Sequence, residues 1–493
     1  MKKVCLTAFL LIVLSAFLTS CGSDEIDEAE SAEDMVADMA AIIDISLEDL
    51  LERALIRREG IQKPSLEEIL VYTQGRTPGP LPYGVWHFQH PRAVSVEEAI
   101  EDVNIFFNAL YSAYAGYVFF GGDEVFLPVR DDIIASLNEL SGMVQHSQIQ
   151  RMLVDGLSPI ITDLHFNIGN TQFDGDMRYF RIVNVYYYRS ENGFRNRESG
   201  LYLHSIQGHE LEDLMRLHLD EQGSLFYRPI VLMDRNYSRD IVFTYEDESY
   251  YLHNWQIIGG SRPTRLDYPT LEWVNGIPVI RVMTFGLDNF GIDHAAPFMG
   301  FVDEVRDEPV IIMDLRGNIG GNGTFPLLWL HDLLGEIVPS NRILLVSGFE
   351  SDQNAHRPQP FADLPYEPEI FFGMEYLENG YFISSNHPPR IVESNTLIIF
   401  LTDRFTTSTA EGFIDWALSM TNTLVIGNPT AGILAFSGDF GGRLHLPNSG
   451  INFGFGRSIN LWPDGLFTEG AGIAPDIWVQ GDALVAALAL LER

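Results

Sequence analysis

Lysine is nearly absent from this chain of 493 residues, in which only Lys2, Lys3 and Lys63 occur. Lysine and arginine together number 31 against 68 acidic residues, so the formal net charge is −37 at pH 7. Because nucleic-acid binding depends on cationic side chains that neutralise phosphates, this balance argues against nucleic acid as a partner. The acidity is compatible with basic or extended substrates, although a solvated acidic surface is its more common explanation.

Cysteine is also scarce, since only Cys5 and Cys21 occur. Both lie in a segment typical of export, with a basic start, an apolar run over 4–18 and a small-residue exit. The sequence LTSC at 18–21 resembles the lipobox of bacterial lipoproteins, and an ordinary secretory signal is the alternative. We therefore expect a signal peptide over 1–20, lipidation at Cys21, no disulfide, and an extracytoplasmic protein anchored to a bacterial membrane. No other apolar run approaches the length of about 18 residues that a spanning helix needs.

The N-terminal third is predicted to be helical. Residues 21–60 read as an acidic tether followed by a short helix, which starts at the capping-box sequence SLED and stops at Gly60. Region 61–170 is predicted as a helical domain, because 96–117 and 130–161 place apolar residues at three- and four-residue intervals.

Strands dominate the next region, 171–262, where short alternating segments predict a small β-rich domain. Within it, SIQGHELEDLMRL resembles the strand, turn and helix of a PDZ domain, and a generic β-domain is the alternative. From 263 to 493 nearly all-apolar strands alternate with helices, which predicts an α/β domain whose parallel or mixed sheet is buried on both faces. The last sixty residues are again predicted to form β-hairpins.

A serine-rich turn is the first candidate for chemistry. Ser408 follows the predicted buried strand TLIIFLTD and precedes the predicted helix AEGFIDWALSM. A serine there lies near free backbone N–H groups and the positive end of a helix dipole, which favours stabilisation of an oxyanion. The same four residues, Ser408 to Glu411, also form an S-x-x-E capping box, in which serine and glutamate only satisfy the helix start. The stretch alone favours the cap.

A glycine-rich loop is the second candidate. After a predicted strand that ends at Asp314, four glycines occur within the seven residues 317–323. Glycines allow tight turns and direct bare N–H groups at a ligand, although a purely structural strand-to-helix turn is the alternative. A phosphate-binding Walker loop is excluded because its Gly-Lys-Ser/Thr end is missing.

In order and spacing these stretches resemble the S41 peptidases, the family of tail-specific and tricorn-like proteases. Members carry a D-L-R-x-N-x-G-G loop, then an S-x-x-E turn, then a G-x-x-T-x-G segment, which here reads GNPTAG at 427–432. The resemblance covers most of 263–480. It implies a spiral α/β core similar to crotonase and Clp protease, with a helical N-terminal cap, and it implies Ser408 as the nucleophile. The region 345–395 matches no family segment and is a candidate for the substrate cleft.

The resemblance also implies how the serine is activated. Tail-specific members use a lysine just after the T-x-G segment, a route that composition excludes because no lysine follows Lys63. Tricorn-like members use a histidine and a glutamate, and the segments DLHF and PDG…EG…PD place these at His165 and Glu469. His165 is preceded by Leu164, where the family more often has glycine or serine.

The implied roles are those of a serine peptidase. His165 takes the proton of Ser408 and returns it to the leaving amine, while Glu469 orients the imidazole. The N–H of Thr409, with that of Gly320 or Gly321, forms the oxyanion hole. No metal site or cofactor is expected, since the histidines show no ligand spacing.

The leading functional hypothesis is a lipid-anchored serine endopeptidase of the tricorn-like branch that cuts exported proteins or peptides. A binding lipoprotein that keeps the fold without turnover is the alternative, and hydrolysis of a non-peptide ester by the same residues is a third. The substrate and the oligomeric state are not encoded in any pattern we recognise.

Overall fold

A computed structural model describes most of the chain from residue 45 onward. The predicted signal peptide, Cys21 and nearly all of the acidic tether lie outside the described residues. Within the described part, no helix is both long and apolar enough to cross a membrane. The described ranges are 45–175, 177–182, 185–207, 209–236, 241–253, 255–258, 267–287, 291–347, 371–438 and 444–493.

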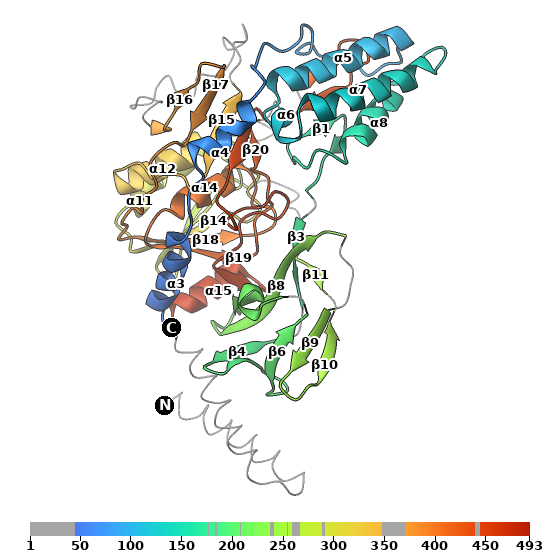
Figure 1. The fold of residues 1–493 in the computed structure, drawn as a ribbon. Helices are drawn as coiled ribbons and strands as arrows, with labels where there is room; N and C mark the ends of the chain where they lie inside the picture. The colour runs from blue at the N-terminus through green and yellow to red at the C-terminus, as the bar shows by residue number, and fades with distance from the viewer. Residues whose placement is uncertain are drawn as a thin grey trace, which may run out of the picture.

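Helix α3 (Leu47–Glu59) confirms the first predicted helix. The Ser46 side chain accepts the Asp49 N–H in a capping box, and Gly60 ends the helix. Its buried face, which includes Leu50 and Ala54, belongs to the same hydrophobic cluster as the central strands. Figure 1 shows α3 beside the C-terminal helix α15 (Ala483–Leu491), at the edge of the core.

The predicted helical region consists mainly of α5, α7 and α8, which lie together in Figure 1. The apolar pattern over 130–161 is divided between two helices, because the chain turns at Gly142 with φ +84°. Phenylalanines of the C-terminal hairpin, Phe453 and Phe455, complete the core of this region. Its helices are α4 (Leu66–Leu70), α5 (Val96–Ala113), α6 (Gly116–Phe119), α7 (Asp123–Asn138) and α8 (His146–Leu157).

Strands dominate the region predicted to be β-rich. The stretch compared with a PDZ domain forms β6 (Tyr202–Ile206), a single helical turn α9 (Leu211–Leu214) and then β7 (Met215–Leu219). This arrangement does not confirm a PDZ-like domain. The other strands are β3 (Met177–Arg181), β4 (Tyr187–Ser190), β5 (Gly193–Asn196), β8 (Leu225–Asp234), β9 (Ile241–Tyr245), β10 (Tyr250–His253) and β11 (Gln256–Ile257).

The alternation of strand and helix predicted for the C-terminal half is confirmed. Strands β13, β14, β18, β19 and β24 pair in parallel, and every residue of β18 and β19 is buried. The sheet continues through a parallel β24–β7 pair into the β-rich region, so one mixed sheet spans both. Its elements here are β12 (Thr270–Val274), β13 (Ile277–Arg281), β14 (Val310–Asp314), β18 (Leu397–Thr402), β19 (Thr423–Gly427) and β24 (Ile477–Val479), with α10 (Ala295–Gly300), α11 (Val302–Val305), α12 (Thr324–Leu334) and α14 (Thr409–Ala417).

A second, five-stranded sheet lies beside this core, and part of region 345–395 enters it. Residues 348–370 lie outside the described part of the chain, so the predicted role of that stretch in a cleft is not addressed. The strands of this sheet are β15 (Ile343–Ser347), β16 (Glu375–Tyr376), β17 (Tyr381–Ser384), β20 (Phe436–Ser437) and β23 (Ser458–Leu461).

A small sheet joins the helical region to the C-terminal hairpin. Strand β1 (Asn167–Ile168) follows directly after the DLHF segment and pairs antiparallel with β22 (Asn452–Gly454). Strands β2 (Thr171–Gln172) and β21 (Leu444–His445) complete the sheet. Two parts of the chain that are nearly three hundred residues apart thus meet beside the core.

Candidate active site

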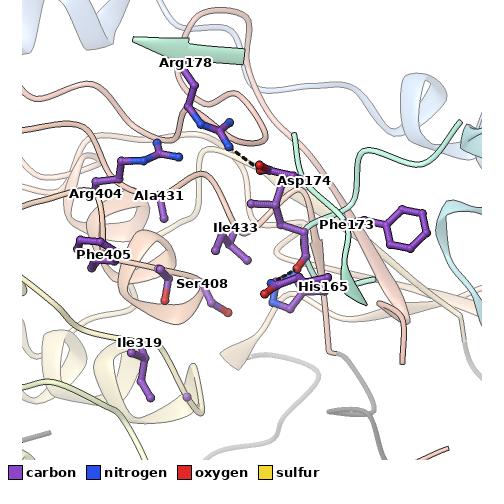
Figure 2. Close-up of a pocket in the computed structure, with 14 residues that line it drawn as sticks. His165, Phe173, Asp174, Arg178, Ile319, Arg404, Phe405, Ser408, Ala431 and Ile433 are labelled. Atoms are coloured by element: carbon purple, nitrogen blue, oxygen red, sulfur yellow. Dashed lines mark hydrogen bonds and ion pairs between the residues drawn. The ribbon is translucent and has the colours of Figure 1, made fainter. Parts of the chain in front are cut away.

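A cavity of about 700 Å³ lies between the core and the small sheet. Ser408 and His165 both line it, as Figure 2 shows, together with the glycine-rich loop. The remaining lining residues are Leu164, Gln172, Phe173, Asp174, Arg178, Ile319, Gly321, Arg404, Phe405, Thr407, Ala431 and Ile433.

The Ser408 turn connects β18 to α14 in an unusual backbone conformation. Ser408 is the N-cap residue of α14 and has φ 54° and ψ −118°, whereas an ordinary N-cap residue is extended. A positive φ is uncommon for a residue with a side chain and is maintained only where the surroundings fix it. Strain of this kind often accompanies functional sites, so this turn is a candidate for function.

The hydrogen bonds between Ser408 and Glu411 at this helix start use backbone atoms of the serine. Ser408 and Glu411 stand in the box arrangement, and the Ser408 N–H donates to Glu411 Oε2 at 2.9 Å. The Glu411 N–H, however, donates to the Ser408 carbonyl oxygen at 2.9 Å, and the Ser408 hydroxyl makes no cap hydrogen bond. The hydroxyl that the sequence assigns to the helix start therefore makes no cap hydrogen bond, and Ser408 lines the cavity.

Glu411 ties the serine turn to the GNPTAG segment. Its buried carboxylate also accepts Thr430 Oγ1–H at 2.6 Å, Gly432 N–H at 2.7 Å and Ile433 N–H at 2.9 Å. Burial raises the pKa of Glu411 to about 7, although these hydrogen bonds act to lower it. This carboxyl group is a positioning element, since it holds the backbone on both sides of the serine.

The glycine-rich loop packs directly against the serine. A Cβ at Gly320 would lie 2.8 Å from the Ser408 Cβ, and a Cβ at Gly321 would lie 2.5 Å from the Phe285 carbonyl oxygen. The Thr407 N–H donates to the Asn318 carbonyl oxygen at 2.8 Å, and Thr409 Oγ1–H donates to the Gly321 carbonyl oxygen at 2.6 Å. Only glycine fits this loop without displacing the backbone beside the serine.

The two glycines named for an oxyanion hole differ in their amides. The Gly320 N–H donates to Asn318 Oδ1 at 2.8 Å and is therefore occupied. Gly321 lines the cavity, and within the described part of the chain neither its N–H nor that of Thr409 donates to another group. Of the two glycines, Gly321 is thus the better candidate to pair with Thr409.

His165 reaches the cavity from the loop between α8 and β1. The backbone N–H of His165 donates to Asp163 Oδ1 at 2.7 Å, and Gln172 Nε2–H donates to the Leu164 carbonyl oxygen at 2.6 Å. Asp163 is fully buried, so the DLHF segment is fixed by a carboxylate that the sequence interpretation quoted without giving it a role. Its position two residues before the histidine is the signal that could have indicated it.

Glu469 lies behind this loop rather than in the cavity lining. It accepts the Leu164 N–H at 3.0 Å and the Ala435 N–H at 2.8 Å. Burial, and then the nearby charge of Asp163, raise the pKa of Glu469 well above its usual value. The structure therefore brings Ser408, His165 and Gly321 into one cavity, with Glu469 against the backbone that carries the histidine.

Lys63 lies outside the cavity lining. Its Nζ donates to the carbonyl oxygens of Ser385 at 2.5 Å and His387 at 3.0 Å, and burial lowers its pKa to about 8. The described residues that line the cavity include no lysine.

Comparisons with known proteins gave structural matches alone. No protein-family model and no curated protein matches the chain. Mature CPAF complexed with lactacystin is similar at 14% identity and a TM-score of 0.39, over 80% of this chain and 96% of that one. The photosystem II D1 C-terminal processing protease is similar at 12% identity and a TM-score of 0.36, over 80% and 96%. The tricorn protease is similar at 11% identity and 0.28, over 80% of this chain and 37% of that one. Scores this low carry no argument about the site, which has to be judged from its own geometry.

Proposed function

We propose that the protein is a serine peptidase that hydrolyses peptide bonds with Ser408 as nucleophile and His165 as general base. One observation carries the proposal: Ser408, which lies on a strained helix-start turn and whose side chain makes no cap hydrogen bond, lines a cavity with His165 and Gly321. Within this proposal the fold is of the S41 type with a crotonase-like core, and the chemistry follows the tricorn-like branch.

The proposed reaction has two stages. His165 accepts the Ser408 Oγ proton as Oγ attacks the carbonyl carbon, and the N–H groups of Thr409 and Gly321 stabilise the oxyanion. His165 then gives the proton to the leaving amine, and water attacks the acyl-enzyme by the same route. Glu469 is proposed to orient His165 by holding its loop, since it accepts the Leu164 N–H.

The biological setting proposed here follows from the N-terminal sequence. Lipidation at Cys21 would tether the enzyme outside the cytoplasm of a bacterium, where exported proteins or peptides are its substrates. The proposal requires no metal and no cofactor.

The test uses a soluble form of residues 22–493, incubated with casein and a mixed peptide pool, with cleavages read by mass spectrometry. We expect cleavage by the parent and none by Ser408→Ala or His165→Ala. Ser136→Ala is the matched control, because this hydroxyl lies on the exposed surface of α7 and bonds only the Asp132 carbonyl oxygen.

Two outcomes would contradict the proposal. Cleavage that survives Ser408→Ala would remove the assigned nucleophile. A folded parent that cleaves nothing would favour the alternative, a lipoprotein that binds peptides or apolar ligands without turnover.

A further inference from the structure

One wall of the cavity is cationic, in a chain whose net charge is −37. Figure 2 shows the guanidinium groups of Arg178 and Arg404 on the same side of the cavity, near Asp174. Arg178 Nη2 pairs with Asp174 Oδ1 at 2.5 Å, and Arg235 pairs with the other oxygen of the same carboxylate. Two arginines, Arg178 and Arg235, therefore share the one carboxylate of Asp174.

The Arg178 side chain is buried and committed to the fold. Besides Asp174, it donates to the carbonyl oxygens of Gly175 at 3.0 Å, Met177 at 2.6 Å and Gly470 at 2.7 Å. Its guanidinium thus fixes the start of β3 against the C-terminal segment. Arg178 therefore places a positive charge beside the cavity, but its N–H donors are used in holding the fold together.

Arg404 differs because its donors are largely unused. In the described part of the chain its one hydrogen bond goes to the Gly470 carbonyl oxygen at 3.3 Å, and it forms no ion pair there. A guanidinium has five N–H donors in a planar fork that matches a carboxylate. Burial, and then the charge of Arg178, lower the pKa of Arg404 to about 10, so it remains protonated at neutral pH. A half-buried, charged fork therefore faces the cavity.

The rest of the lining is mixed. Ile319, Phe405 and Ile433 contribute apolar surface to it, beside polar side chains such as those of Gln172 and Thr407. A ligand complementary to this lining combines an apolar part with an anionic group that can form an ion pair with Arg404.

We infer that Arg404, supported by Arg178, binds a carboxylate of the substrate, so that the cavity selects peptides with an acidic group close to the cleaved bond. This specificity is opposite to the basic substrates with which the net charge is compatible, because the charge at the site differs in sign from the charge of the whole chain. The carboxylate can belong to an Asp or Glu side chain or to the peptide C-terminus, since both offer the same two oxygens. As a statement about cleavage, the inference rests on the proposed function.

The experiment compares matched peptides that differ in one group. One series replaces Glu or Asp by Gln or Asn near the cleaved bond, and a second replaces the terminal carboxylate by an amide. We expect the parent to favour the acidic member of one series by about 10- to 100-fold in kcat/KM, the range of a charge-assisted hydrogen bond. The series that shows the preference identifies the source of the carboxylate.

Variants assign the preference to the residue. Arg404→Gln should bring the acid-to-amide ratio close to one, while Arg404→Lys, which keeps the charge, should retain part of it. Arg390→Gln is the matched control, because Arg390 pairs with Glu336 on the surface and is absent from the cavity lining. The inference is wrong if the parent shows no preference in either series, or if Arg404→Gln, folded by circular dichroism, keeps it.

Binding separates this inference from the proposed function. Fluorescently labelled acidic and amidated peptides are titrated into Ser408→Ala, alone and combined with Arg404→Gln, and their anisotropy is measured. Tighter binding of the acidic peptide that depends on Arg404 supports the inference even if the parent cleaves nothing. Cleavage by the parent with equal binding of both peptides would support the peptidase and overturn the carboxylate site.

Discussion

The two walls that present Ser408 and His165 are built in different ways. The serine wall is local: strand β18, the turn and helix α14 follow one another in the chain, and the glycine-rich loop packs on them. The histidine wall is assembled over long sequence distances, since β1 pairs with β22 and the Leu164 N–H reaches Glu469, 305 residues further along. A local turn presents Ser408, whereas contacts between distant segments position His165.

The largest expected effect tests whether the two walls act as one catalytic unit. Ser408→Ala and His165→Ala should each lower kcat/KM by roughly 10⁴- to 10⁶-fold, and the double variant should lose no more than either single variant. The reason is that His165 acts only by accepting the proton of Ser408, so removing either residue removes the same step. Steady-state kinetics on one cleaved peptide measures the cycle. If the losses in kcat/KM of the two single variants add up in the double variant, Ser408 and His165 contribute independently and do not form one catalytic unit.

The serine wall was largely predictable. Short, wholly apolar strands such as β18 can be recognised from sequence because both faces are covered, and the turn after it follows from the S-x-x-E pattern. What the pattern could not decide was the use of the Ser408 hydroxyl, since a cap and a nucleophile require the same residues. That distinction depends on the backbone angles of one residue and on which oxygen accepts the Glu411 N–H.

The histidine wall was predictable only through the family resemblance. Nothing local in DLHF indicates that Leu164 will meet Glu469, because the energy of that contact is set by burial and by the folding of distant segments. The cationic wall was missed for the same reason. Arg178 and Arg404 are far apart in sequence, and neither has a neighbouring sequence pattern that indicates the other.

A second, smaller effect concerns the buried acid of the serine wall. The pKa of Glu411 is raised from 4.5 to about 7 by burial, so the folded state holds a proton that the unfolded state releases. Its contribution to stability is complete below pH 4.5 and is lost as the pH rises through 7, which amounts to about 3 kcal/mol in the free energy of unfolding.

The measurement is urea unfolding of the parent and Glu411→Gln between pH 4 and 8. We expect the parent to lose stability relative to Glu411→Gln as the pH rises, because glutamine carries no titrating proton. A constant difference across this range would show that Glu411 is ionised throughout, and that its four hydrogen bonds outweigh burial.

The smallest expected effect probes what holds the histidine wall from outside. Buried Asp102 on α5 accepts the N–H groups of Asn448 at 3.0 Å and Ser449 at 2.7 Å, which fixes the turn of the β21–β22 hairpin. Asp102→Asn keeps one acceptor and should lower the free energy of unfolding by about 1–2 kcal/mol. Because the hairpin carries β22, which pairs with β1, kcat/KM for peptide cleavage should also fall. It should fall more than in a variant that loses the same stability elsewhere in the chain.

Thermal unfolding and kcat/KM, measured on the same samples, test this expectation. Glu101→Gln is the control, because its contact with the Asn448 side chain at 3.0 Å is exposed and should contribute little. If both variants behave alike, neither the hairpin nor the histidine wall depends on the buried carboxylate of Asp102.

The pairing of β1 with β22 also sets an order of events during synthesis. A nascent chain carries residue 165 long before residues 452–454 exist, so β1 has only β2 as a neighbouring strand until the ribosome has made nine-tenths of the protein. Incomplete products that end before the hairpin contain every residue that lines the cavity, but they lack the strand with which β1 pairs on its other side. The proposed site therefore depends on a strand that is made only after every residue that lines the cavity.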